Sequence, residues 1–211
     1  MFEIVGLGYE IFCEIVPFFV VAWLLRRRKG KYSVPHTGRH SAYLLLFALY
    51  VMAVLHVTGA GTIYEAIRAK NVTLQNRMQY INLIPFSRDI SISGYVLNIV
   101  MCVPFGFLVP LIWEDMGRVS RILPAGFLFS LLLEVSQLLN IRGTDVDDLI
   151  MNTLGALAGF VVYLAFDKET DGRLQLKNVD ARELPIFVIV MYLGRCLLFN
   201  YLGLMNLWFG Y

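Results

Sequence analysis

Apolar residues fall into six blocks along the chain, and polar segments separate the blocks. The blocks cover residues of about 5 to 25, 41 to 61, 94 to 113, 121 to 140, 149 to 166 and 185 to 205. An α-helix rises 1.5 Å per residue, so about 20 residues cross the ~30 Å hydrocarbon core of a bilayer. The pattern predicts an all-α, polytopic transmembrane bundle of six spans, in which the fifth span is short enough to need tilt or a locally thinned bilayer.

The composition supports a membrane protein and argues against other classes. Hydrophobic residues make up 58% of the 211 residues and charged residues 16%, whereas soluble domains carry roughly 25% charged residues. The formal net charge is +2 and no basic stripe with interleaved aromatic residues is present, so we expect no nucleic-acid partner. Cys13, Cys102 and Cys196 lie inside apolar blocks without a zinc or redox spacing, which predicts no structural disulfide.

Basic residues are divided unevenly between the five loops. The first, third and fifth loops and their borders carry twelve Lys and Arg, whereas the second and fourth carry five. Because basic loops are retained in the cytoplasm, this bias predicts that both termini face outward. The loop of residues 62–93 and the loop IRGTDVDD (141–148) would then face outward as well.

Three ionisable side chains inside apolar blocks are candidates for function or for structural pairing, since such groups are costly in hydrocarbon. These are Glu14, Glu134 and Arg195. Glu14 and Arg195 are both expected roughly 15 Å from the inner ends of their spans. We therefore expect a structural ion pair between the first and last spans, with a substrate or proton pathway as the alternative. His56, alone in the second block, is expected to be a hydrogen-bonded packing residue.

The densest group of polar residues runs from the end of the fourth block into the fifth. Glu134 and Gln137 are three residues apart, Asp145 and Asp148 are three apart, and Asp148 and Asn152 are four apart. Each pair shares one helical face wherever the backbone is helical. One or two of the aspartates would cap the fifth helix, which leaves the other polar groups for a site.

Five residues in the third and fifth blocks are assigned structural roles. Glycines four residues apart allow close helix packing, and two prolines in one span release backbone carbonyls that a neighbouring helix or a cavity must satisfy. The third span is therefore either a broken helix that faces a polar cavity or a helix with a packing kink. The five residues are Pro104, Gly106, Pro110, Gly155 and Gly159.

Most of these polar groups are predicted at the outer face of the membrane, which indicates an outward-facing polar cavity. The outer stretch YINLIPFSRD, from Tyr80, combines polar and apolar residues and is expected to fold back at the outer interface. The residues expected to bind a ligand are Asn82, Asn98, Gln137, Arg142 and Asn152.

Two kinds of chemistry remain open at this site, so the sequence does not decide whether the protein is an enzyme. Glu134, Asp145 and Asp148 could hold a divalent cation such as Ca²⁺ or Mg²⁺, although the sequence DVDD lacks the pattern of a calcium loop. Alternatively, one of these carboxyl groups or Arg142 takes part in catalysis. A carboxyl group would be the general acid or base, and Arg142 would bind an anionic group such as a phosphate.

At these residues the sequence resembles the VanZ-like family of small bacterial membrane proteins. The matching elements are NLIPF from Asn82, N-x5-PFG-x3-P from Asn98, and E-x2-Q-x4-R-x2-D-x2-D-x3-N-x2-G-x3-G from Glu134 to Gly159. The chain is divided accordingly into three parts. Residues 1–79 hold two spans and the start of the outer loop, 80–166 form the VanZ-like core with NLIPF and three spans, and 167–211 hold a cytoplasmic linker and the last span.

The resemblance implies a multi-pass protein of the bacterial plasma membrane. It implies low-level resistance to teicoplanin and related lipoglycopeptides in Gram-positive bacteria, without the precursor rewriting that blocks vancomycin. Expected partners are membrane lipids and either a lipoglycopeptide antibiotic or a lipid-linked wall precursor.

Three mechanisms follow as hypotheses. The first is a resistance factor that binds or shields its ligand without turnover. The second is a membrane-embedded enzyme that modifies a lipid or a lipid-linked cell-wall precursor. The third is a small transporter with Glu14, Arg195 and Glu134 as a charge relay, against which the lack of an internal repeat counts.

Overall fold

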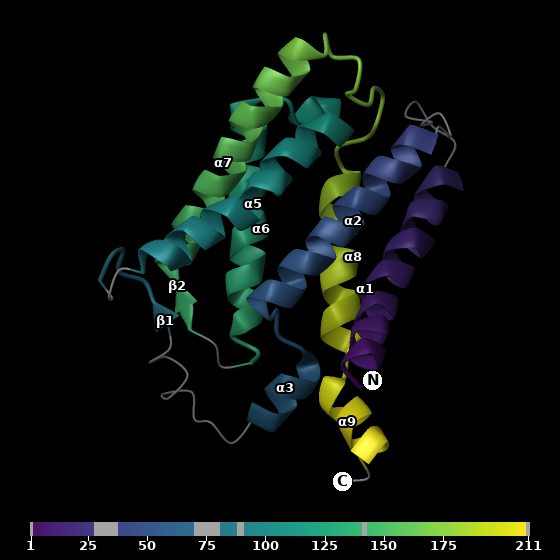
Figure 1. The fold of residues 1–211 in the computed structure, drawn as a ribbon, viewed down its shortest axis with the longest axis vertical. Coiled ribbons are helices and arrows are strands. Elements are labelled where there is room, and N and C mark those ends of the chain that lie inside the picture. The colour runs from purple at the N-terminus through teal and green to yellow at the C-terminus, as the bar shows by residue number, and fades with distance from the viewer. Residues whose placement is uncertain (1, 28–37, 70–80, 88–90, 141–142, 210–211) are drawn as a thin grey trace.

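The chain folds as a helical bundle in a computed structural model that describes residues 2–27, 38–69, 81–87, 91–140 and 143–209 (Figure 1). Within these residues, six helical stretches are long and apolar enough to cross a membrane. The predicted all-α, six-span architecture is therefore confirmed. The long helices are α1 (Phe2–Arg27), α2 (Gly38–Thr58), α5 (Ile92–Ile112), α6 (Val119–Gln137), α7 (Val146–Glu169) and α8 (Glu183–Leu198).

Short elements connect the long helices and differ from the sequence-based expectation in two places. The fifth span is not short, because α7 extends over 24 residues. Its first turn, from Val146, includes Asp147 and Asp148, which lie before the apolar block. The last apolar block is interrupted after α8 and continues as a separate helix. The short elements are α3 (Ile63–Arg68), β1 (Ile81–Asn82), the 3-10 turn η2 (Glu114–Met116), β2 (Thr144–Asp145) and α9 (Tyr201–Phe209).

The long helices form two groups that α2 joins. Helices α5, α6 and α7 pack together, with the α5–α7 contact the most extensive in the described chain, while α1 packs along α8. Helix α2 contacts members of both groups. The ends of the bundle are distinct: one, here called the terminal end, carries the start of α1, both strands and α9, and the other carries η2 and the α7–α8 connection (Figure 1).

Glycines allow the close approach of α5 and α7, as their spacing predicted. Gly155 lies against the backbone carbonyl of Ile99, and Gly159 lies against that of Val103. A side chain at either glycine would have to occupy the space of a backbone atom on α5. From the α5 side, Gly106 lies equally close to the carbonyl of residue 156. The backbones of α5 and α7 therefore approach each other closely at all three glycines.

Helix α5 continues through both of its prolines. Pro104 and Pro110 lie inside the single helix, so the expectation of a broken helix is wrong and a proline-containing packed helix is found. Neighbouring segments bind carbonyls near the prolines. The Tyr50 hydroxyl of α2 donates to the Met101 carbonyl at 3.1 Å, and the Gln175 side chain donates to the Pro110 carbonyl at 3.1 Å. These bonds hold α5 to α2 and to the segment that follows α7.

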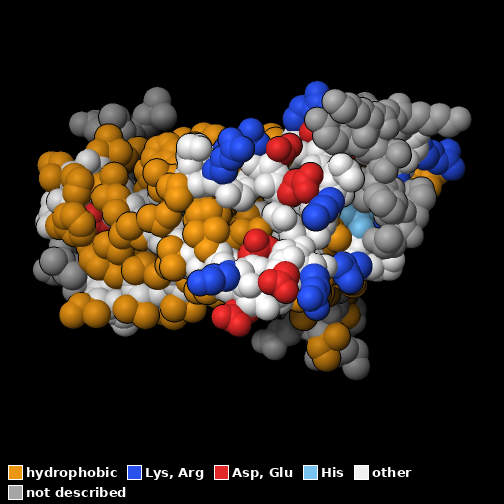
Figure 2. Space-filling model, turned by 90° about the horizontal axis from the view of Figure 1, so that it is seen from above, with side chains coloured by type: hydrophobic (Ala, Val, Ile, Leu, Met, Phe, Trp, Pro, Cys, Tyr) orange, Lys and Arg blue, Asp and Glu red, His pale blue; other side chains and the backbone are white. Residues whose placement is uncertain are grey.

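The end opposite the termini is rich in charges and is here called the charged end. Figure 2 views it from above and shows basic and acidic side chains gathered beside a continuous hydrophobic area. The Arg182 guanidinium holds the pKa of Asp180 below its usual value through a charged hydrogen bond. Three pairs with at least one exposed side chain lie here: Arg121–Asp115, Arg173–Asp171 and Arg182–Asp180.

Candidate functional site

Three stretches that are far apart in the sequence meet at the terminal end of the α5–α7 group. Strand β1 runs parallel to β2, with Ile81 opposite Thr144 and Asn82 opposite Asp145 (Figure 1). This pairing, which the sequence did not predict, joins the NLIPF segment to the DVDD segment. The residues that meet there are called the polar cluster: Asn82, Tyr95, Asn98, Glu134, Asp145, Asp147 and Asp148.

Asp145 links the two strands to the end of α6 and to the start of α7. Its carboxylate accepts two hydrogen bonds from the Asn82 amide, each of 3.2 Å, and caps α7 by accepting the Asp147 backbone N–H at 3.0 Å. Its own backbone N–H donates to the Glu134 carboxylate at 3.1 Å. Asp145 is thus the expected helix cap, and it also anchors the NLIPF segment.

Asp147 fixes the other end of the NLIPF segment. Asp147 is buried, with an exposed fraction of only 3%. One oxygen accepts the backbone N–H of Phe86 at 2.9 Å, and the other accepts the Tyr95 hydroxyl of α5. Phe86 has a φ of +56°, a left-handed conformation that is uncommon for an aromatic residue and is held here by this bond.

Asp148 and Glu134 each retain a carboxyl oxygen that the described residues do not bind. The Asn98 amide donates to Oδ1 of Asp148, and Glu134, 3% exposed, accepts the Asp145 N–H through Oε2. Among the described residues, no hydrogen bond reaches Oδ2 of Asp148 or Oε1 of Glu134. These are two carboxyl oxygens of the polar cluster that remain for a ligand or a proton.

Two residues predicted to bind a ligand point elsewhere. Asn152 is buried and donates to the Ser130 hydroxyl at 3.1 Å, inside the α6–α7 contact. Gln137 donates to the Thr58 carbonyl at 3.3 Å, at the end of α2. Its oxygen is buried without a described partner. Both side chains therefore position helices, while Asn82 and Asn98 do belong to the polar cluster. Arg142 lies outside the described residues.

The geometry gives no support to the cation hypothesis. Within the described ranges, no group of three or more His, Cys, Asp or Glu side chains is arranged to hold a metal ion. The carboxylates of Glu134, Asp145 and Asp148 lie in one region, but protein donors bind them. Asp145 in particular uses both oxygens for the Asn82 amide, which leaves a poor set of ligands for Ca²⁺ or Mg²⁺.

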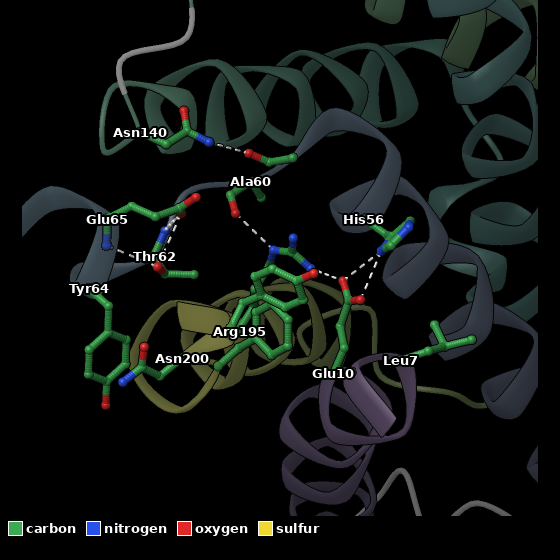
Figure 3. Close-up of a pocket in the computed structure, with 14 residues that line it drawn as sticks. Leu7, Glu10, His56, Ala60, Thr62, Tyr64, Glu65, Asn140, Arg195 and Asn200 are labelled. Atoms are coloured by element: carbon green, nitrogen blue, oxygen red, sulfur yellow. Dashed lines mark hydrogen bonds and ion pairs between the residues drawn. The ribbon is translucent and has the colours of Figure 1, made fainter. Parts of the chain in front are cut away.

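A second group of ionisable residues links α1, α2 and α8. The predicted pair is present: Arg195 donates to the Glu14 carboxylate at 2.9 Å, and Glu14 is fully buried. Arg195 also contacts Glu10 and donates to the Ala60 carbonyl at 2.8 Å. His56 contacts Glu10 at 2.8 Å (Figure 3). These four side chains, Glu10, Glu14, His56 and Arg195, are called the ion-pair cluster.

Sequence reasoning missed some members of both clusters. Glu10 lies four residues before Glu14, so the helical spacing placed both on one face and was a usable signal. His56 is hydrogen-bonded as expected, but its side chain is 58% exposed and not packed in the core. Tyr95 carried no signal, because a lone tyrosine in the first turns of an apolar helix is typical of many membrane proteins.

Replacing Tyr95 with phenylalanine is expected to lower the thermal transition of the protein, because the Tyr95 hydroxyl donates a hydrogen bond to the Asp147 carboxylate. The variant would leave one oxygen of the buried Asp147 without its donor. Thermal unfolding of the detergent-solubilised protein measures the effect. The control is Tyr43→Phe, since the Tyr43 hydroxyl makes no hydrogen bond to the described residues. Equal transition temperatures for the two variants would contradict the assigned role.

Comparison with known proteins identifies the family. A protein family described as VanZ/LLP1 matches residues 47–167, more than half of the chain. The chain belongs to the VanZ/LLP1 family. It is also 24% identical over 156 residues to Protein VanZ of Enterococcus faecium, an alignment that covers 74% of this chain and 90% of that protein. No solved structure matches the chain.

The region that matches the family contains the whole polar cluster but only one residue of the ion-pair cluster. Residues 47–167 include every member of the polar cluster, and they include His56 of α2. Glu10, Glu14 and Arg195 lie outside this range. The polar cluster therefore belongs to the part of the fold that defines the VanZ/LLP1 family, and the ion-pair cluster joins that part to α1 and α8.

Proposed function

We propose that this VanZ-family protein resides in a bacterial plasma membrane and lowers susceptibility to teicoplanin, with the polar cluster as its working site in the outer leaflet. The observation that carries the proposal is the convergence of three motif segments, from Asn82, Asn98 and Glu134, on one cluster at the terminal end. The excess of basic residues at the opposite loops supports an outward orientation of this end. Teicoplanin is the antibiotic that the VanZ-like resemblance implies, and the similarity to Protein VanZ over 90% of that protein supports the resemblance.

Expression in a sensitive Gram-positive host is expected to raise resistance to teicoplanin and leave resistance to vancomycin unchanged. The variant Asp148→Asn should return teicoplanin susceptibility to that of the host without the protein, because it removes a charge from one of the two carboxyl groups with an unbound oxygen. Minimum inhibitory concentrations at matched membrane levels measure both effects.

The matched control is Asp171→Asn at the charged end. Asp171 is exposed and has a φ of +49°, a conformation that asparagine adopts readily, so this variant should protect as well as the wild type. Absence of protection by a well-expressed wild type would refute the teicoplanin role. Full protection by Asp148→Asn would refute the role of the polar cluster.

A second function, a membrane-embedded enzyme, is favoured by one observation. Oε1 of Glu134 and Oδ2 of Asp148 receive no hydrogen bond from the described residues, and such carboxyl groups can exchange protons with a substrate. The substrate would be a lipid or a lipid-linked cell-wall precursor. Mass spectrometry of extracted lipids separates the two functions: an enzyme yields a new species that disappears in Glu134→Gln or Asp148→Asn, whereas a binding protein yields none.

A further inference from the structure

A cavity at the terminal end lies apart from the polar cluster. It has a volume of about 690 Å³ and is bounded by α1, the α2–α3 connection, the end of α8 and the start of α9 (Figure 3). This volume lies in the range of small-molecule sites, roughly 300–1,000 Å³. Gln137 at the end of α6 donates to the Thr58 carbonyl, and Asn140 just after α6 donates to the Gly59 carbonyl in one wall, so a motif residue and its neighbour support the cavity.

The cavity wall offers hydrogen-bond donors that the described residues leave unused. Arg195 binds Glu10, Glu14 and Ala60 through Nη1 and Nε, and its third nitrogen, Nη2, makes no hydrogen bond to a described residue. Asn200 uses Oδ1 to accept the Gly203 backbone N–H at 2.9 Å, while its amide nitrogen makes no such bond. Figure 3 shows both side chains on the cavity wall.

The same wall also offers an acceptor. Glu65 closes the first turn of α3 with one oxygen, Oε2, which accepts the Thr62 N–H at 2.8 Å and the Thr62 hydroxyl at 3.1 Å. Its other oxygen, Oε1, receives no hydrogen bond from the described residues. A ligand that fits this wall must therefore both accept and donate hydrogen bonds, as hydroxyl groups do.

The charge of the wall disfavours an anionic ligand. Arg195 is already matched by two carboxylates, Glu10 and Glu14, and Glu65 adds a further negative charge. Among the described residues that line the cavity, a phosphate would meet no uncompensated cation. Three aromatic rings, of Tyr64, Phe199 and Tyr201, also line the cavity and offer flat apolar surfaces to a ring that carries hydroxyl groups.

The cavity borders the lipid-facing side of α1. Leu7 lines it, and the side chains of Ile4, Leu7 and Ile11 are exposed along the same helix. An acyl chain attached to a bound headgroup would find an apolar path there. We propose that this cavity binds the uncharged sugar headgroup of a glycolipid in the outer leaflet, an activity separate from the polar cluster.

Binding to the full-length protein in nanodiscs tests the proposal, with diglucosyl diacylglycerol and phosphatidylglycerol as probes at equal mole fractions in phosphatidylcholine. Native mass spectrometry of the released complexes is expected to show preferential retention of the glycolipid. Two variants change only the ligand-facing groups. Glu65→Gln keeps the side chain able to close the turn, and Asn200→Asp keeps the oxygen that accepts the Gly203 N–H.

Each variant should weaken glycolipid binding by about tenfold, the effect of one lost hydrogen bond to a charged or polar group. The control Asn206→Asp makes the same chemical change on an exposed residue of α9 that does not line the cavity, and it should bind like the wild type. Unchanged thermal transitions verify folding. Preference for phosphatidylglycerol, retention of neither lipid, or equal glycolipid binding by all variants would overturn the proposal.

Discussion

Replacing Gly159 with alanine is expected to separate α5 from α7 and to lower the thermal transition of the solubilised protein. The new methyl group would overlap the Val103 carbonyl and lie 3.0 Å from the Val103 Cα, and backbone atoms cannot move aside as a flexible side chain can. Overpacking typically costs about 1–3 kcal/mol and occasionally more. In a protein of this size the transition temperature should fall by roughly 2–12 °C. The measurement is the fraction of protein that stays monodisperse after heating to a series of temperatures.

The control for this variant is Gly8→Ala in α1. No heavy atom lies within 4 Å of a side chain placed there, and alanine is favoured over glycine inside a helix by roughly 0.5–1 kcal/mol. The Gly8→Ala transition should therefore stay unchanged or rise. A Gly159→Ala protein as stable as the control would show that α5 and α7 are not packed backbone to backbone.

Replacing Arg195 with methionine is expected to have the largest effect on stability. The variant leaves Glu10 and Glu14 buried without their shared cation and the Ala60 carbonyl without its donor. Removal of one partner from a buried ion pair costs about 3–5 kcal/mol. The free energy of unfolding by SDS titration measures the loss.

Rescue distinguishes lost pairing from lost packing. Adding Glu10→Gln and Glu14→Gln to Arg195→Met removes the unpaired charges, so the triple variant should be more stable than Arg195→Met. The control Arg173→Met breaks an exposed pair and should cost at most about 1 kcal/mol. A triple variant less stable than Arg195→Met would contradict the electrostatic account.

The bundle was predictable because its causes are local in the sequence. Apolar blocks of the length of a bilayer define the spans, and the glycine spacing at positions 155 and 159 defines the face that contacts α5. The Glu14–Arg195 pair followed from the high cost of charges in hydrocarbon and from the similar predicted depths of the two residues. The start of α7 was less clear, since its first turn holds aspartates that hydropathy assigns to a loop.

The sequence predicted most of the residues that form the candidate site, but not which of them contact one another. Helical spacing predicts which residues share a face of a helix, but it does not predict which other segment of the chain packs against that face. Glu134 and Gln137 are three residues apart, yet Glu134 contacts β2 and Gln137 contacts the end of α2. The β1–β2 pairing joins residues more than 60 positions apart through two residues per strand, too short a stretch for any periodic pattern to reveal.

The pairing of β1 with β2 is the contact on which the polar cluster depends, and cysteine cross-linking tests it most directly. Ile81 and Thr144 lie opposite each other in the parallel pair, and neighbouring strands bring Cα atoms to about 5 Å, within reach of a disulfide. Ile81→Cys with Thr144→Cys is expected to cross-link on mild oxidation in native membranes. Ile81→Cys with Asp171→Cys, at opposite ends of the bundle, is expected not to cross-link (Figure 1). No cross-link in the first pair, or equal cross-linking in both, would contradict the account.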